Sequence, residues 1–327
     1  MKSEALQKSI KQNISIVLVS VGCIILWLMM GIFGTGIRLS SLIDNAYTAS
    51  FLAIAGLAQM LVVTTGRGAI DLSIPGMITL GAFTSMGLCN GSNSMIIPAL
   101  LVVIAEGIIV GILNSSMVIM LKIPAIIATM AMNYIIVTAT MLIDHNFNVF
   151  TIPSILKTVV TYRVAGVPII IAFVIILAIV IRYLLNSTAY GKGLVAMGQN
   201  QEAARLAGVE IVKIEMLTYI AASVLAGLAG ALISARVTGA YLGMGDNYQV
   251  DSIACIVVGG TLMSGGRANA AGTLIGALFL YLITSCMQLM GANAGIQSVV
   301  KGALIIVILL MGANDQSKKR QKKYQKS

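Results

Sequence analysis

Charged side chains are scarce in this sequence. Only 10% of its 327 residues are Asp, Glu, Lys or Arg, whereas 58% are hydrophobic, and the mean hydropathy is +0.97. Soluble domains carry about 25% charged residues, and a chain of this length has too little interior to hide so much apolar surface. The composition therefore excludes a soluble protein and predicts an all-α polytopic membrane protein.

The residues that build catalytic and metal centres are also few. The chain has a single histidine, His145, and its four cysteines, Cys23, Cys89, Cys255 and Cys286, lie far apart without the spacing of metal ligands. It contains no GxxxxGK[ST] phosphate loop and no HExxH or GxSxG pattern. We therefore expect that this chain is no enzyme, binds no metal or cofactor and hydrolyses no ATP itself.

Long apolar runs are what the sequence has in abundance. A helix needs about 20 apolar residues to cross the hydrocarbon core of a bilayer. Ten runs come close to this length, the eighth being interrupted by Gly259 and Gly260. The expected spans are 14–33, 47–65, 73–91, 95–120, 123–143, 167–185, 214–235, 249–264, 271–290 and 296–313. They predict one transmembrane domain over 14–313, between an N-terminal tail of 1–13 and a basic C-terminal tail of 314–327.

The positions of the basic residues predict the orientation. The net charge is +10, but six cations crowd the C-terminal tail, namely Lys318, Lys319, Arg320, Lys322, Lys323 and Lys326. With ten spans and a cytoplasmic N-terminus, 16 of the 21 Lys and Arg residues fall on the cytoplasmic side. We expect both termini to be cytoplasmic, with the basic tail facing anionic lipid rather than nucleic acid.

A polar segment over 186–213 interrupts the apolar pattern and contains "GQNQEAARLAGV" at 198–209. It predicts a short helix with Asn200 as N-cap, Glu202 in the first turn and Gly208 just past the end. The helix formers between them are Ala203, Ala204, Arg205 and Leu206. Because so short a helix is marginal in water, it either docks against a partner or lies on the bilayer surface.

Two glycine-rich stretches also break the apolar runs. In "GRGAIDLSIPG" (66–76), which includes Gly68, Asp71 could cap a helix starting near Ser73 or pair with Arg67. The other stretch is "GGTLMSGGRANAAG" (259–272), with Gly265, Gly266 and Arg267. Residues 52–68 and 252–268 both end in Gly-Arg, which fits an internal repeat and chance similarity equally well.

Polar side chains inside the expected spans are candidates for a solute path. Asn114, Asn133 and Tyr134 could line such a path or form hydrogen bonds between helices. Glu106 is the acidic residue deep inside an expected span. Because ion-coupled transport usually needs a relay of several ionisable groups, Glu106 alone argues against that mechanism.

Four stretches taken together resemble a known family. "GAIDLSIPGMITLGAF", "GILNSSMVIMLKIPAIIATMAMNYI", "YGKGLVAMGQNQEAARLAGVEIVKI" and "DSIACIVVGGTLMSGGRANAAGTLIGAL" are similar to permease subunits of bacterial ABC sugar importers of the ribose, xylose and autoinducer-2 type. The resemblance covers about residues 45–312, although Gly68-Ala69 stands where the family usually has two glycines. It implies a dimer of two copies or paralogues in the bacterial plasma (inner) membrane. It also implies a cytoplasmic ABC ATPase that holds ATP-Mg and an extracytoplasmic sugar-binding protein.

The resemblance assigns a role to the polar helix. The matching segment of the family is a coupling helix that sits in a groove of the ATPase, which implies coupling roles for Gly198, Asn200, Glu202, Ala203, Ala204, Arg205, Leu206 and Gly208. We therefore expect the permease subunit of an ATP-driven, binding-protein-dependent importer for a pentose-like sugar or small polyol. The alternatives are a stand-alone ion-coupled transporter or channel and, far behind, a membrane enzyme.

Overall fold

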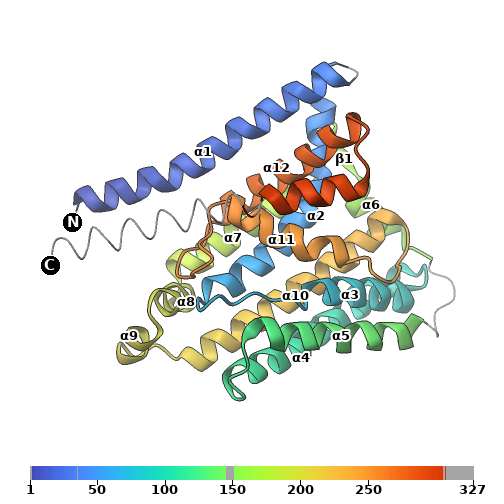
Figure 1. The fold of residues 1–327 in the computed structure, drawn as a ribbon. Helices are drawn as coiled ribbons and strands as arrows, with labels where there is room; N and C mark the ends of the chain where they lie inside the picture. The colour runs from blue at the N-terminus through green and yellow to red at the C-terminus, as the bar shows by residue number, and fades with distance from the viewer. Residues whose placement is uncertain (1, 35, 145–150, 305, 307–327) are drawn as a thin grey trace.

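The computed structural model describes residues 2–34, 36–144, 151–304 and 306, with the side chains of the first helix described from residue 16 onward. The described chain is a bundle of helices (Figure 1). The helices are α1 (Lys2–Phe33), α2 (Leu39–Thr64), α3 (Ile74–Cys89), the 3-10 turn η1 (Asn93–Met95), α4 (Ile96–Ile119), α5 (Ala125–Asp144), α6 (Ser154–Thr161), α7 (Ile169–Ser187), α8 (Ala189–Gln199), α9 (Gln201–Leu206), α10 (Ile211–Val237), α11 (Asp246–Val258) and α12 (Ala270–Leu289). Strands β1 (Arg163–Val164) and β2 (Val167–Pro168) form a small antiparallel hairpin.

Seven of the described helices are long and apolar enough to cross a membrane: α1, α2, α4 with η1, α5, α7, α10 and α12. Each of the first nine expected spans coincides with a helix, but α3 and α11 have only 16 and 13 residues. The expected span 249–264 is corrected to Asp246–Val258, because the chain leaves helical geometry at Gly260, whose φ is +83°. Residues 294–304 form a helix that includes the first part of the tenth expected span, 296–313. The rest of that span, apart from residue 306, lies outside the described residues, so the count of ten spans stays a prediction.

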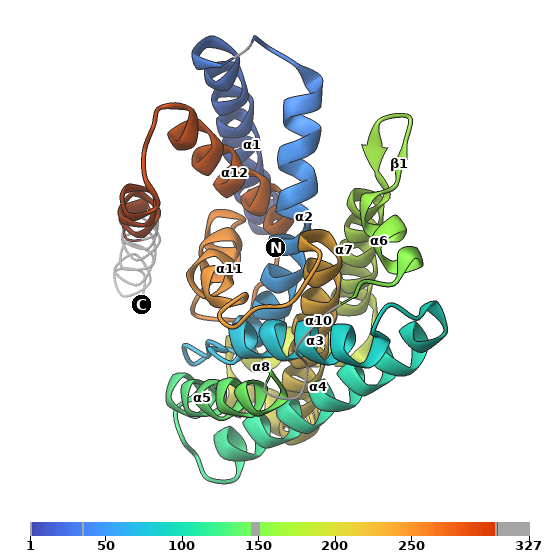
Figure 2. The same ribbon diagram turned by 90° about the vertical axis from the view of Figure 1, so that its right-hand side faces the viewer.

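Helix α2 runs through the middle of the bundle and is buried almost completely from Ala49 to Thr64. It packs against α11 and α12 and against α10 (Figure 2). On the other side of α10, helices α3, α4 and α5 form a further layer, while α1 lies against α12. The centre of the fold is therefore the contact of α2 and α10 with the short helices α3 and α11.

Small residues allow the helices to approach closely. A methyl group on Gly111 of α4 would collide with Ile220 of α10, and one on Gly107 would lie 2.7 Å from the Cα atom of Val224. In α12, a methyl group on Gly276 would collide with the carbonyl of Cys255 in α11. Gly107 and Gly111 form a GxxxG pair, as do Gly272 and Gly276, and both pairs thus lie at helix contacts. Such small residues matter in a membrane, where lipid gives no hydrophobic driving force for helix association.

The outer faces of the long helices are apolar. Ile97 and Leu101 of α4 are 71% and 60% exposed, and Ile176 and Ile179 of α7 are each 60% exposed. Continuous apolar faces of this kind require lipid rather than water around them. The protein is thus an all-α, multi-pass membrane protein.

Candidate functional site

Helices α8 and α9 lie at the end of the bundle where α1 begins, opposite the end that carries the hairpin (Figure 1). Asn200 separates them, and its side-chain oxygen accepts a hydrogen bond from the Ala203 amide at 3.1 Å, which confirms the predicted N-cap. Gly208 has φ +82°, which confirms the predicted left-handed residue after the helix. The predicted polar helix is therefore a separate, capped element.

The two faces of α9 differ. Ala204 is buried against the bundle, whereas Leu206 is 85% exposed and Ala203 is also exposed. Glu202 and Arg205 form a 3.4 Å ion pair on the exposed side. Ala203 and Leu206 are therefore the apolar side chains that α9 presents on its exposed side, whereas Ala204 faces the bundle.

Backbone from three segments meets at the end of α8, two residues before α9 begins. We call Gly66, Gly198, Gly265 and Gly266 the glycine junction. A methyl group on Gly198 would collide with the Thr64 carbonyl and the Gly266 amide, and one on Gly66 would lie 2.9 Å from the Gly198 oxygen. The Gly266 amide donates to the Thr64 carbonyl at 3.0 Å, and Gln199 Nε2 donates to the Gly266 carbonyl at 3.3 Å. The end of α8, directly before α9, therefore fits tightly against the loops that follow α2 and α11.

Residues 65–73, here the 65–73 segment, cross from the end of α2 to the start of α3 without forming a helix (Figure 1). Thr129 of α5 accepts a hydrogen bond from the Leu72 amide at 2.9 Å. The Gln59 amide, oriented to suit its partners, bonds both backbone groups of Asp71 at 3.0 and 3.1 Å. Non-helical backbone is tolerated inside a membrane protein only where such partners replace water. Side chains of α2 and α5 thus make this segment possible.

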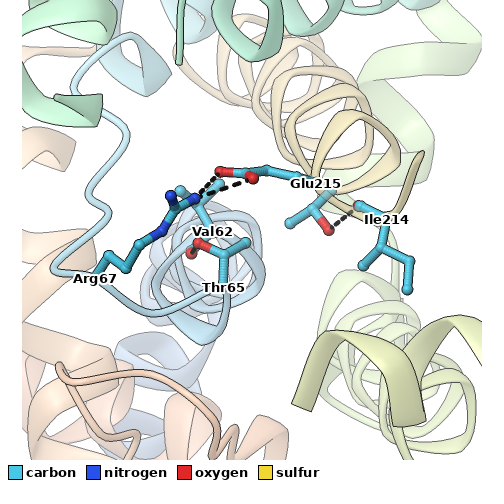
Figure 3. Close-up of polar contacts among 6 residues, drawn as sticks. Val62, Thr65, Arg67, Ile214 and Glu215 are labelled. Carbon is cyan, nitrogen blue, oxygen red and sulfur yellow. Dashed lines mark hydrogen bonds and ion pairs between the residues drawn. The ribbon is translucent and has the colours of Figure 1, made fainter. Parts of the chain in front are cut away.

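The two alternatives for Asp71 are resolved. Asp71 Oδ1 accepts hydrogen bonds from the Ser73 amide and hydroxyl at 2.8 and 2.6 Å, just before α3 begins. Arg67 instead pairs with Glu215 of α10, and Figure 3 shows its guanidinium between the 65–73 segment and that helix. Arg67 Nη2 lies 2.9 and 3.1 Å from the two Glu215 oxygens. Asp71 therefore acts at the helix start, and the ion pair joins two elements.

A cleft of about 600 Å³ lies beside α9. Glu202 and Arg205 line one side, Arg67 and Glu215 another, and Lys122 of the α4–α5 loop a third. Three cations and two carboxylates therefore surround an opening between the coupling-helix candidate and the bundle.

The proposed path residues lie in different surroundings. Asn133 Oδ1 accepts a hydrogen bond from the Gly76 amide at 2.9 Å, and Asn114 Nδ2 donates to Ser73 Oγ at 2.8 Å. Tyr134, by contrast, is 61% exposed on the outer face of α5. The structure thus gathers Asn114 and Asn133 around the start of α3 but not Tyr134, and their role as path lining stays a prediction.

The remaining loop residues differ in their surroundings. Gly68 has φ +71° with open space around it, whereas Gly265 and Gly266 belong to the glycine junction. Arg267 is half-buried, and its backbone carbonyl accepts from the Leu262 amide at 3.2 Å. The two Gly-Arg pairs of the possible internal repeat, Gly66-Arg67 and Gly266-Arg267, therefore lie in loops that contact each other.

Several residues of this site were not predicted from the sequence. They are Gln59, Gly66, Thr129, Gln199 and Glu215. A glutamine or glutamate inside an apolar run is a signal that could have found Gln59 and Glu215. Nothing local marks Thr129, whose importance comes from the segment it faces.

The chain was compared with known proteins. The family described as the permease component of the branched-chain amino acid transport system matches residues 41–309. The ribose import permease of Escherichia coli K12 is 30% identical over 290 residues, which is 85% of this chain and 87% of that protein. The ribose import permease of Bacillus subtilis is 34% identical over 146 residues, 45% of each chain. The fructose import permease of Bifidobacterium longum is 28% identical over 81% of this chain and 75% of its own length.

No solved structure matches the chain significantly. The family match covers most of the sequence, and the E. coli relative is similar over 85% of the chain. The resemblance to ribose-type permeases, expected from the four sequence stretches, is confirmed. The chain belongs to this family of ABC-transporter permease components.

Proposed function

We propose that this protein is the membrane-spanning subunit of an ATP-driven, binding-protein-dependent importer for a pentose-like sugar or related small polyol. Relatives similar over most of the chain are named as ribose and fructose import permeases, which supports a sugar as the solute. In this proposal the chain provides the path through the bacterial plasma membrane as one of two permease copies or paralogues. An extracytoplasmic protein delivers the sugar.

The α8–α9 segment carries the proposed coupling to a cytoplasmic ABC ATPase. The observation that carries this proposal is the combination of an exposed Leu206 in α9 with Gly198, at the end of α8, which the glycine junction holds. A partner that holds the exposed side of α9 can displace it together with the end of α8, because Gly198 there is packed against backbone rather than against flexible side chains. ATP-Mg would be bound by that ATPase.

The test is co-purification of the permease with the ABC ATPase whose gene lies nearest to the permease gene. We expect Leu206→Glu to abolish co-purification, because it places a charge in the apolar contact. Leu39→Glu is the matched control, since Leu39 is 63% exposed at the opposite end of the bundle, and it should leave the complex intact.

Transport by the reconstituted complex tests the solute. Uptake of radiolabelled ribose, xylose and fructose into liposomes should require ATP and the binding protein, with the pentoses preferred. Uptake by the permease alone, driven by a proton or sodium gradient, would instead establish the ion-coupled alternative and contradict the proposal.

A further inference from the structure

The 65–73 segment touches the chain on both sides of α9. Before α9, Gly198 packs against Gly66 so closely that a methyl group on Gly66 would lie 2.9 Å from the Gly198 oxygen. After α9, Glu215 of α10 is paired with Arg67, the residue that follows Gly66 (Figure 3). Two consecutive residues of one segment therefore hold the chain that enters α9 and the chain that leaves it.

We propose that the 65–73 segment takes up the movement of α9 through these two contacts and transmits it to α3. The proposal rests on the proposed function, in which an ATPase displaces α9. Gly66 and Arg67 are then positioning residues for coupling, although neither belongs to the coupling helix.

The two contacts resist displacement for different physical reasons. At the glycine junction, backbone lies on backbone, so a push on α9 toward the bundle moves the neighbouring chain with it. Glu215 is only 2% exposed, and pulling Arg67 away would leave its carboxylate buried and unpaired. The first contact therefore depends on close packing of backbone, and the second on the pairing of a buried charge.

Beyond these contacts, the 65–73 segment is bonded to the helices that surround it. Gln59 and Thr129 hold its backbone at Asp71 and Leu72, and Ser73 at its end receives a hydrogen bond from Asn114 of α4. A displacement at Gly66 and Arg67 consequently reaches the start of α3 and its neighbours. Such a network is a route for coupling only if disturbing it changes the response at a distance.

The experiment follows an introduced cysteine in the segment, Ile70→Cys, in the purified complex of permease and ATPase. Ile70 is half-buried and therefore partly accessible to reagent. The four native cysteines are free thiols, but all of them are buried. We expect the non-hydrolysable nucleotide AMP-PNP to change the rate of labelling by N-ethylmaleimide about fivefold, the lower end of typical couplings between sites. Ile37→Cys, 57% exposed at the opposite end, is the matched control and should label at one rate in both states.

Substitutions at the contacts then test the route. Arg67→Glu should abolish the nucleotide effect at position 70, and Arg67→Glu with Glu215→Arg should restore it. Gly198→Ala should abolish it independently, whereas Gly239→Ala should not, since nothing lies within 4 Å of the side-chain position of Gly239. Arg67→Glu and Gly198→Ala should also lower the unfolding temperature, because the first leaves Glu215 buried beside a second carboxylate and the second forces a methyl group against backbone. The nucleotide effect is therefore measured in variants that still bind the ATPase, and its return in the Arg67→Glu, Glu215→Arg double variant separates transmission from folding.

The outcomes distinguish this proposal from the proposed function. Absence of a nucleotide effect in the Ile70→Cys complex overturns the transmission role of the segment. Persistence of the effect in Arg67→Glu or in Gly198→Ala overturns the part assigned to that contact. Failure of the ATPase to bind the unsubstituted permease overturns the proposed function instead.

Discussion

At the scale of single residues, polar side chains in the described interior compensate backbone that has left the helix. Gln59 and Thr129 bond backbone groups of the 65–73 segment, and Asn133 accepts from the Gly76 amide in the first turn of α3, where helix amides lack partners within the helix. An unsatisfied amide in this setting costs about 1–3 kcal/mol. The non-helical segment therefore depends on side chains that are far away in sequence.

Thr129→Val tests this dependence. The change keeps the shape of the side chain but leaves the Leu72 amide without its acceptor, so we expect a loss of about 1–3 kcal/mol in stability. Thr138→Val on the same helix is the control, because Thr138 is exposed and its hydroxyl only donates to the Tyr134 carbonyl one turn earlier. Unfolding in detergent measures both, and equal stability of the two variants would contradict the interpretation.

At the scale of elements, α9 is defined by how its ends are formed. Asn200 caps its start, and Gly208 ends it in a conformation that costs other residues about 1–2 kcal/mol. The space around the Gly208 side-chain position is open, so the requirement is one of backbone geometry and not of packing.

Gly208→Val should therefore displace the end of α9 and uncouple ATP hydrolysis from uptake, while the protein still inserts into the membrane. The expected result is loss of solute-stimulated ATPase activity in the reconstituted complex. Gly239→Val is the control, since its position is equally open and does not need a positive φ. Normal stimulation in Gly208→Val would count against the role of α9.

At the scale of the whole molecule, charge and structure agree on two ends. Among the described residues, six basic residues belong to the end with α9, namely Arg67, Lys122, Lys192, Arg205, Lys213 and Arg267. Four of the described basic residues belong to the end with the hairpin, namely Arg38, Lys157, Arg163 and Arg236. The excess of basic residues at the α9 end predicts that this end is cytoplasmic.

Cysteine labelling in intact cells tests this orientation. A membrane-impermeant maleimide should label Tyr162→Cys, which is 54% exposed beside the hairpin, but should reach Leu206→Cys only in inverted vesicles. Labelling of Leu206→Cys from outside would reverse the topology and remove any contact with a cytoplasmic ATPase.

The sequence by itself determined the class of protein, the approximate positions of its helices, the caps of α9 and the family. These features follow from local composition and from patterns of a few residues, which can be recognised without knowledge of the tertiary structure. Only the tertiary structure decided that Arg67 pairs with Glu215, 148 positions away, and that Gly66 lies against Gly198. Such contacts depend on how helices pack around α2, and nothing in the local sequence of Arg67 or Gly66 encodes their partners.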